Sequence, residues 1–203
     1  MSRTCYIVGA GEFFGSFAPL DDDFVIAADG GYAELISRGI RCDLLVGDLD
    51  SLKSVANDVK TLTFPPEKDD TDMRLAYLEG KKRGYTSFEI YGGTGGRSDH
   101  TFANYCLLYE MKLDGCEARL HGRSDIAYII RNEATRGGGS SNKYISVFAF
   151  SEKASGVCIQ GLKYEVTDAI LQPHFPLGVS NQKTGGEYEI SVSDGTLLII
   201  EEL

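Results

Sequence analysis

The feature that most constrains the fold is a change of pattern near Gly122. Before this point short apolar runs alternate with segments of helical periodicity, and after it strand-like runs follow one another without helices. The expected strands of the first part are Cys5–Val8, Phe24–Ala28, Leu44–Val46, Thr61–Phe64, Phe88–Tyr91 and Arg119–His121. The expected helices are Tyr32–Arg38, Ser51–Val59, Thr71–Arg83 and Thr101–Leu113. Such alternation is typical of a mainly parallel sheet with helices on both faces.

The clearest helical pattern lies in the segment Thr101–Leu113. Its apolar residues recur at helical spacing and predict the buried face of the helix. This stripe consists of Phe102, Tyr105, Cys106, Tyr109 and Leu113. Asp99 is suited to cap the start of the helix, and Gly115 follows its end.

The second part of the chain predicts an antiparallel β-sandwich. Its expected strands are Ile126–Arg131, Tyr144–Phe150, Val157–Gln160, Lys163–Val166, Tyr188–Ser193 and Thr196–Glu201. Asp194-Gly195, between the last two runs, predicts a two-residue hairpin, and the stretch 137–141 predicts a mobile hairpin tip. We therefore expect an α/β domain over residues 1–122 and a β-sandwich domain over residues 123–203.

Charge and composition exclude several classes of function. The 203 residues carry a net charge of −10, which disfavours nucleic acid and anionic membranes as partners. We find no segment with the roughly 20 apolar residues needed to cross a membrane. Five scattered cysteines without a C-x-x-C pair predict reduced thiols in the cytoplasm, and three scattered histidines argue against a zinc site.

Acids or glycines follow four of the expected strands. These segments are Asp29-Gly30-Gly31, Gly47-Asp48-Leu49-Asp50-Ser51, Pro65-Pro66-Glu67-Lys68-Asp69-Asp70-Thr71-Asp72 and Gly92-Gly93-Thr94-Gly95-Gly96-Arg97-Ser98-Asp99-His100. Each also fits a local role, as turn residues, as acids at a helix start or as a flexible loop. Because a parallel sheet brings the carboxyl ends of its strands to one rim, we expect the four segments to meet there.

Five aspartates would then share one cleft: Asp29, Asp48, Asp50, Asp69 and Asp72. Carboxylates crowded together repel one another, so this arrangement is unfavourable unless cations occupy the cleft. Oxygen ligands suit magnesium, which shares its coordination shell with substrate phosphates. The glycine-rich loop allows backbone N–H groups to approach phosphates, and Lys68 and Arg97 add positive charge. The pattern predicts metal-assisted phosphoryl chemistry on a nucleotide.

The ordered set of motifs resembles that of the thiamine pyrophosphokinases. It comprises Asp29-Gly30-Gly31, Gly47-Asp48-Leu49-Asp50-Ser51, Lys68-Asp69-Asp70-Thr71-Asp72, Gly95-Gly96-Arg97-Ser98-Asp99-His100 and Gly178-Val179-Ser180-Asn181. The likeness spans about residues 5 to 200, with a poorly matched stretch from about 130 to 175. The resemblance implies a transfer of diphosphate from ATP to the hydroxyl of thiamine, which gives AMP and thiamine diphosphate. It also implies a homodimer whose thiamine site lies between the N-terminal domain of one subunit and the C-terminal domain of the other.

The resemblance further implies a role for each matched residue. Residues 1–122 would bind nucleotide and metal, and residues 123–203 would bind thiamine. The implied magnesium ligands, direct or through water, are Asp48, Asp50, Asp69 and Asp72, with Asp29 beside them. The implied ATP-phosphate residues are Lys68, Gly92, Gly93, Gly95, Gly96 and Arg97. At the thiamine end the implied residues are Asp99, Ser180 and Asn181, and Phe175 is a candidate for stacking because the chain lacks Trp.

The mechanism expected from these residues is an in-line attack of the thiamine hydroxyl on the β-phosphorus of ATP. Either Asp72 or Asp99 could take the proton. A histidine at a helix start is more often structural, so His100 receives no role, and neither does His121 or His174.

Two other functions fit parts of the sequence. The segment Gly9–Gly15 followed by Asp29 is similar to the fingerprint of an NAD-dependent oxidoreductase, although its third glycine is one place late. A nucleotide-sensing module without turnover would need the acidic cleft but no vitamin pocket.

Overall fold

The computed structural model describes residues 3–48, 59–64 and 69–203 of the chain. The chain divides into two compact units, Met1–Arg123 (unit 1) and Ser124–Leu203 (unit 2). The expected helix Ser51–Val59 lies outside the described residues, apart from Val59. None of the helices in the described ranges is both long and apolar enough to span a membrane.

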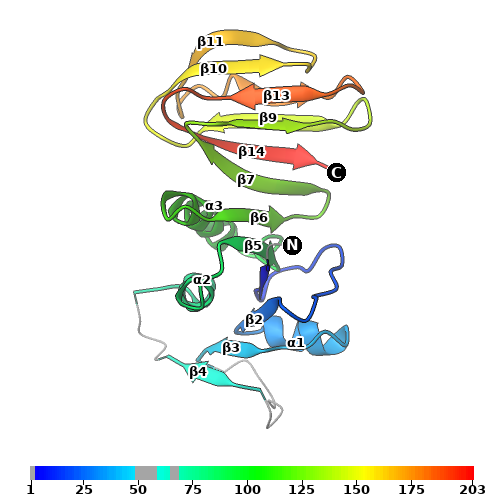
Figure 1. Cartoon of the computed structure of the whole chain (residues 1–203), viewed down its shortest axis with the longest axis vertical. Helices are drawn as coiled ribbons and strands as arrows, with labels where there is room; N and C mark the ends of the chain where they lie inside the picture. Colours follow the sequence, from blue (N-terminus) through cyan, green and yellow to red (C-terminus); the bar gives the residue numbers. More distant parts are fainter. Residues whose placement is uncertain (1–2, 49–58, 65–68) are drawn as a thin grey trace. The chain divides into compact units, whose positions relative to one another are not determined.

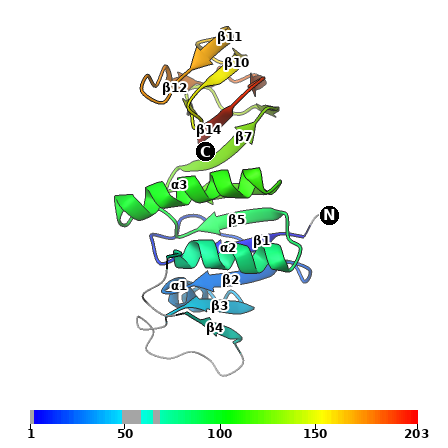
Figure 2. The ribbon, with the colours of Figure 1, turned by 90° about the vertical axis from the view of Figure 1, so that its left-hand side faces the viewer.

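Unit 1 alternates strands and helices along the chain. In order these are β1 (Cys5–Val8), β2 (Phe24–Ala28), α1 (Gly31–Ser37), β3 (Leu44–Gly47), β4 (Thr61–Thr63), α2 (Asp72–Lys82), β5 (Ser87–Tyr91), α3 (Ser98–Leu113) and β6 (Glu117–His121). The strands lie in the order β4-β3-β2-β1-β5-β6, and each neighbouring pair is parallel. Helix α1 covers one face of this sheet, and α2 and α3 cover the other (Figures 1 and 2). The predicted parallel α/β architecture is therefore confirmed.

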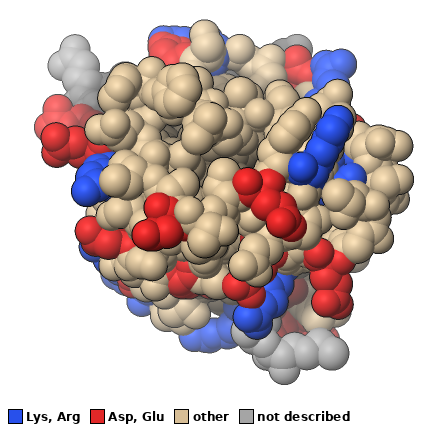
Figure 3. All heavy atoms as spheres, turned by 90° about the horizontal axis from the view of Figure 1, so that it is seen from above, with Lys and Arg blue, Asp and Glu red and all other residues tan. Residues whose placement is uncertain are grey.

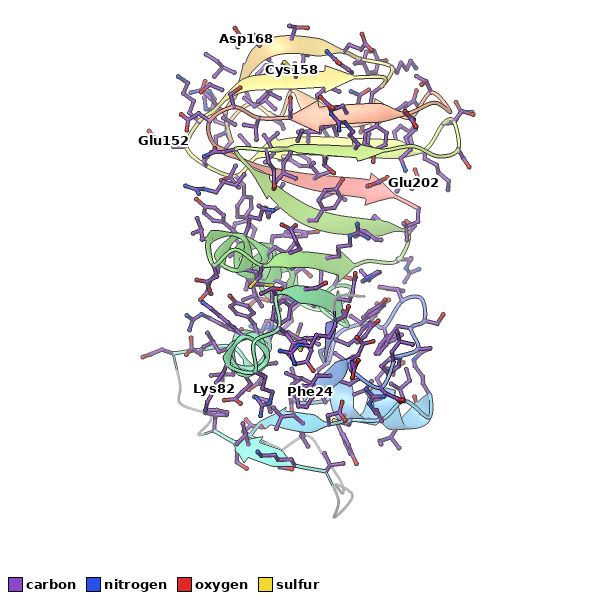
Figure 4. The ribbon with its side chains drawn as sticks, in the orientation of Figure 1. Phe24, Lys82, Glu152, Cys158, Asp168 and Glu202 are labelled. Atoms are coloured by element: carbon purple, nitrogen blue, oxygen red, sulfur yellow. The ribbon has the colours of Figure 1, made fainter. Side chains whose placement is uncertain are left out.

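The ends of α2 follow from its sequence. The Thr71 side chain caps the helix by accepting a hydrogen bond from the backbone N–H of Arg74 at 3.2 Å. Lys81 and Lys82 lie in the last turn, where positive charge complements the negative end of the helix. Lys82 is labelled in Figure 4.

Helix α3 exists as predicted but buries a different face. Of the predicted stripe, Phe102 is 63% exposed and Leu113 is 53% exposed, and Cys106 is also exposed. The buried residues are Asn104, Leu107, Leu108 and Met111. The helix begins at Ser98 with Arg97 at the N-cap position, so Asp99 lies in the first turn and does not cap the helix. The predicted face was wrong because α3 is apolar on more than one side, and periodicity alone cannot choose between two such sides.

Unit 2 is built from strands. They are β7 (Asp125–Arg131), β8 (Ala134–Gly137), β9 (Tyr144–Ala149), β10 (Ala154–Gln160), β11 (Val166–Leu171), β12 (Gly178–Gln182), β13 (Tyr188–Ser191) and β14 (Thr196–Glu202). They form two antiparallel layers, β12-β9-β14-β7 and β11-β10-β13-β8. The two layers share one core, to which Val147 and Ile199 contribute from the first and Val157 and Ile190 from the second. This confirms the predicted antiparallel sandwich.

The connections of unit 2 differ from those predicted. The Asp194-Gly195 turn joins β13 to β14, which belong to different layers, so it is not a two-residue hairpin. The stretch 137–141 likewise leads from β8 in one layer to β9 in the other and is not a hairpin tip. The strand expected at Lys163–Val166 begins only at Val166, and β8 and β12 were not predicted. Turn chemistry shows that the chain reverses but does not specify which strand becomes its neighbour.

Candidate functional site

The strand order of unit 1 creates a crevice at the carboxyl ends of β1 and β5. The chain runs outward from β1 through β2, β3 and β4 and then returns to place β5 on the other side of β1. Ligands of open α/β sheets bind where the strand order reverses in this way. The candidate site therefore belongs at this rim.

Two glycine-containing loops cross at the rim in direct backbone contact. The N–H of Gly11 donates to the carbonyl oxygen of Gly92 at 2.8 Å, and that of Glu12 donates to Thr94 at 2.9 Å. Gly92 has φ +62°, and a Cβ at this position would lie 2.3 Å from the carbonyl oxygen of Gly9. Only glycine tolerates this approach, so part of the glycine content of both loops serves their packing on each other.

A cleft of about 320 Å³ opens at the same rim. It is lined by Gly9, Ala10, Ala28, Asp29, Asp48, Asp70, Thr71, Asp72, Met73, His100, Ala103 and Asn104. Asp29, Asp48 and Asp72, which come from the ends of β2 and β3 and from the start of α2, thus meet in one cleft. None of the described residues that line it is Lys or Arg.

The backbone explains how Asp29 and Asp48 come together. Asp29 has φ +48°, and its N–H donates to the carbonyl oxygen of Val46 on the neighbouring strand at 2.8 Å. A Cβ at Gly47 would lie 3.2 Å from the Cα of Asp29, so the absence of a side chain lets the end of β3 approach the end of β2. Asp48 is the residue after Gly47, so it lies at the same end of the sheet as Asp29.

Asp70 is held at the edge of the cleft by Arg74. The Arg74 guanidinium contacts Asp70 on one side, and on the other Nε and Nη2 donate to Glu110 of α3 at 2.8 and 2.6 Å. Hydrogen bonds to Glu110 and then Asp70 raise the pKa of Arg74. This network fixes the start of α2 against α3 and neutralises one of the acids beside the cleft.

Several predicted residues do not line the cleft. Arg97 and Asp99 pair with each other at 2.5 Å on the surface, with side chains 73% and 63% exposed. The hydrogen bond from Arg97 is the main cause of the lowered pKa of Asp99. Gly92 and Gly93 are buried, whereas Gly95, Gly96 and Asp69 are exposed. Asp50 and Lys68 lie outside the described residues.

Other residues line the cleft although no role was predicted for them. His100 and Ala103 reach it from α3, as does Asn104, whose Nδ2 donates to the carbonyl oxygen of Gly93 at 2.7 Å. The available signal was a polar residue one helical turn after His100, within an otherwise apolar helix. Thr71 lines the cleft beside Asp72 and caps α2.

The donor set of the cleft is suited to a hard divalent cation. Of its four acids, Asp29, Asp48 and Asp72 supply carboxylate oxygens that are not paired with Arg74, and carboxylate oxygens are the preferred ligands of magnesium. Within residues 3–48, 59–64 and 69–203, no three His, Cys, Asp or Glu side chains lie close enough to hold an ion by themselves. Magnesium fits this arrangement, because it commonly takes one or two carboxylates and completes its shell with water and substrate phosphates.

In unit 2, Ser180 and Asn181 lie in β12 with different environments. Ser180 is exposed, has φ +56° and donates its N–H to the Ser146 hydroxyl at 3.0 Å. Asn181 is 4% exposed, and its side chain forms hydrogen bonds with the N–H and the carbonyl of Tyr164 at 3.0 and 2.7 Å. Its oxygen also accepts from the N–H of Gln182 at 2.9 Å. Asn181 therefore holds the Tyr164 segment against β12.

Large apolar side chains are exposed near Ser180 in the sequence. They are Tyr164, Ile170, Phe175, Leu177 and Val179, each at least half exposed. Seen from the side of β10 and β11, broad areas of the surface carry neither acids nor bases (Figure 3). A contiguous patch of exposed apolar side chains is typical of a surface that contacts a partner or a ligand, whereas single exposed apolar side chains are common.

Comparison with known proteins relates both units to one family. Residues 20–120 match the family model of the thiamin pyrophosphokinase catalytic domain, and residues 128–197 match that of the thiamin pyrophosphokinase vitamin B1 binding domain. The chain is 28% identical over 182 residues to the thiamine pyrophosphokinase of Bacillus subtilis (strain 168), an alignment that covers 86% of this chain and 85% of the relative.

Solved structures give the same relation. The crystal structure of thiamine pyrophosphokinase from Bacillus subtilis matches with a TM-score of 0.89 and 25% identity, and covers 98% of this chain and 99% of that one. That of thiamin pyrophosphokinase from Geobacillus thermodenitrificans matches with a TM-score of 0.86 and 25% identity, with 99% and 98% covered.

Proposed function

The chain belongs to the thiamin pyrophosphokinase family, and on this premise we propose which of its residues bind each substrate. Members of the family transfer a diphosphate from ATP to thiamine, so this chain is a thiamine diphosphokinase. The products are AMP and thiamine diphosphate. We place the enzyme in the cytoplasm, a proposal supported by the free state of its five cysteines.

Neither alternative function is supported by the comparisons. The oxidoreductase fingerprint requires a helix directly after its glycines. Here the residues after β1 lead to β2, and α1 follows β2 instead. The contacts of Gly9 and Gly11 with the loop after β5 account for these glycines without a dinucleotide.

The observation that carries the site assignment is the convergence of Asp29, Asp48 and Asp72 in one cleft. We propose that these acids hold a magnesium ion, together with Asp50 and Asp69 of the same two motifs. When bound, magnesium neutralises charge on the diphosphate that is transferred and on the departing AMP. The proposal is supported by the excess of carboxylates over described cations along the cleft wall.

For the ATP phosphates we propose the exposed part of the loop after β5 together with two cations. Gly95 and Gly96 leave their backbone accessible, and a Cβ on Gly96 would meet nothing within 4 Å. Arg97 offers a planar set of N–H donors and Lys68 a point charge. Gly92 and Gly93 would act indirectly, by fixing where this loop begins.

The proton of the thiamine hydroxyl requires an acceptor, and Asp72 is the better of the two candidates. Asp72 lines the cleft, whereas Asp99 lies outside it and is paired with Arg97. That pairing lowers the pKa of Asp99, which makes its carboxylate a weaker base. We propose that the hydroxyl attacks the β-phosphorus of ATP in line, with Asp72 as the proton acceptor.

For thiamine we propose Ser180 as a direct contact and an exposed aromatic ring as a stacking surface. Tyr164 is 60% exposed and Phe175 is 62% exposed. Asn181 would act through Tyr164, because the backbone of Tyr164 and Gln182 already uses its carbonyl oxygen and one of its amide hydrogens. We further propose a homodimer in which these residues complete the cleft of the partner subunit, a proposal supported by the exposed apolar side chains that neighbour them in the sequence.

The activity assay uses the purified chain with ATP, thiamine and magnesium, and AMP is measured with and without thiamine. We expect Asp48→Asn and Asp72→Asn each to remove most of the thiamine-dependent AMP formation and to leave the melting temperature unchanged or higher, because self-repulsion in the cleft falls. Asp21→Asn, at an exposed acid outside the cleft, is the matched control and should retain activity. Wild-type turnover and magnesium dependence in both cleft variants would reject the metal assignment.

A further inference from the structure

We propose that the side-chain carbonyl oxygen of Asn104 accepts a hydrogen bond from a hydroxyl or amino group of a bound substrate. The inference rests on the proposed function of the cleft and adds a substrate-binding residue to it. Asn104 is the one polar residue on the buried face of α3. Its exposed fraction is only 5%, and yet it lines the cleft.

The orientation of the Asn104 amide follows from its partner. A backbone carbonyl oxygen can only accept hydrogen bonds, so the amide nitrogen of Asn104 must face Gly93, at the observed 2.7 Å. The oxygen occupies the opposite branch of the planar amide and must point away from that loop. Gly93 leaves the room for this contact, since a Cβ there would lie 3.1 Å from Asn104 Nδ2 and 2.6 Å from a Leu120 methyl.

The Asn104 oxygen has no hydrogen-bond partner among the described residues, while the nitrogen does. In the described part of the chain, the Thr94 hydroxyl is the only fully buried side-chain polar atom without a partner. The oxygen of Asn104 is therefore not sealed in the core. Because the residue is otherwise buried and lines the cleft, the cleft is the route by which the oxygen is reached.

The position of Asn104 in the cleft defines what it can bind. The acids Asp29, Asp48 and Asp72 come from β2, β3 and α2, whereas Asn104 comes from α3 and is bonded to Gly93 on the loop after β5. A carbonyl oxygen accepts hydrogen bonds and repels the oxygens of a phosphate, which offer no proton at neutral pH. Its ligand is therefore a neutral N–H or O–H group, which the ribose or adenine of ATP and the hydroxyl or aminopyrimidine of thiamine both offer.

Two substitutions at Asn104 test this contact by steady-state kinetics. Asn104→Leu has a similar shape and removes both hydrogen bonds, whereas Asn104→Asp keeps an acceptor and loses the donor to Gly93. We expect Asn104→Leu to raise KM for one substrate about 5- to 100-fold, because the donor group of that substrate is left without its hydrogen-bond partner. KM for the other substrate should change less than about twofold, and the identity of the affected substrate tells whether ATP or thiamine supplies the donor. Asn104→Asp should melt as low as the leucine variant but keep the affected KM closer to wild type.

Leu108→Ala is the matched control, since Leu108 is buried one turn further along the same face and does not line the cleft. It should lower the melting temperature without selective change in either KM. The proposal is overturned if both KM values rise together in the Asn104 variants and rise no more than they do in Leu108→Ala for the same loss of stability. Asn104 would then only anchor the loop after β5. Wild-type thiamine-dependent AMP formation, measured first, tests the proposed function separately.

A measurement on the wild-type chain covers the case in which the variants do not fold. The side-chain amide signal of Asn104 in ¹⁵N-labelled protein is followed during separate titrations with AMP, with ATP and magnesium, and with thiamine. A hydrogen bond accepted by the oxygen polarises the amide, so we expect a saturable shift with the adenosine ligands or with thiamine. Saturation of the protein by all of these ligands without any shift of this signal would refute the contact.

Discussion

Asn181 offers a quantitative test of the difference between a residue that touches thiamine and one that holds the site together. Its side chain makes three hydrogen bonds, two with the backbone of Tyr164 and one with that of Gln182, and is 4% exposed. Each such bond contributes about 1 kcal/mol net, so Asn181→Leu loses about 3 kcal/mol. Burial of the larger apolar side chain offsets part of this, which leaves an expected loss of about 2 to 3 kcal/mol in the free energy of unfolding.

The loss is measured by urea denaturation of wild type and Asn181→Leu, read as a shift of the midpoint at constant slope. Ser180→Ala is the matched comparison at the neighbouring position, where the side chain is exposed. We expect Ser180→Ala to leave the midpoint unchanged and to raise KM for thiamine more than KM for ATP. A loss below about 1 kcal/mol for Asn181→Leu, together with a selective rise in KM for thiamine, would show that the inferred structural role is wrong.

Two further predictions concern the stability of unit 1. Gly92→Ala should lower the free energy of unfolding by about 3 kcal/mol or more, because a φ of +62° is unfavourable for alanine and its Cβ would lie 2.3 Å from the Gly9 carbonyl oxygen. Gly96→Ala should change the free energy of unfolding by less than about 0.5 kcal/mol. Thermal unfolding of both variants checks this, and equal effects would contradict the crossing of the loops. The hydrogen bond from Lys81 is the main cause of a pKa of Asp114 below its ordinary 3.8, so Asp114 stabilises the fold above that pH and this contribution is lost as the pH falls through the lowered pKa. Asp114→Asn should therefore be less stable than wild type at pH 7, and the difference should vanish in acid; a difference independent of pH would contradict the pairing.

The sequence predicts unit 1 well because its strands are marked in two independent ways. Apolar runs such as Phe24–Ala28 are buried along most of their length, and glycine or acid stands where the chain leaves the sheet after β1, β2, β3 and β5. The acids at these strand ends also predicted the cleft. Asp29 and Asp48 follow strands that are parallel neighbours if a helix connects them, so both acids lie at the same rim of the sheet. Sheet topology, unlike side-chain rotamers, is thus strongly constrained by the order of elements.

Unit 2 was predicted less well because antiparallel neighbours are chosen by packing between layers. The Asp194-Gly195 turn has the chemistry of a tight hairpin, but β13 pairs with β10 and β8 while β14 pairs with β7 and β9. Short strands such as β8 and β12 carry glycine and polar residues that individually disfavour strands. Their pairing with β13 and β9 supplies the missing stabilisation, and no local pattern encodes that pairing.

Helix α3 shows why the cleft contains residues that sequence reasoning passed over. The helix presents two stripes of similar spacing, one through Phe102 and Leu113 and the other through Leu107 and Met111, and only the position of the sheet decides which one is buried. The stripe through Phe102 contains no amide or charged side chain, so a choice based on hydrophobicity favours it. Asn104 interrupts the other stripe, and that interruption carries the functional information: a buried amide is tolerated there because Gly93 satisfies its nitrogen and the cleft gives access to its oxygen. A polar residue that weakens the apolar pattern of a helix beside a ligand-binding rim therefore points to the site more directly than the acids that a helix start would favour anyway.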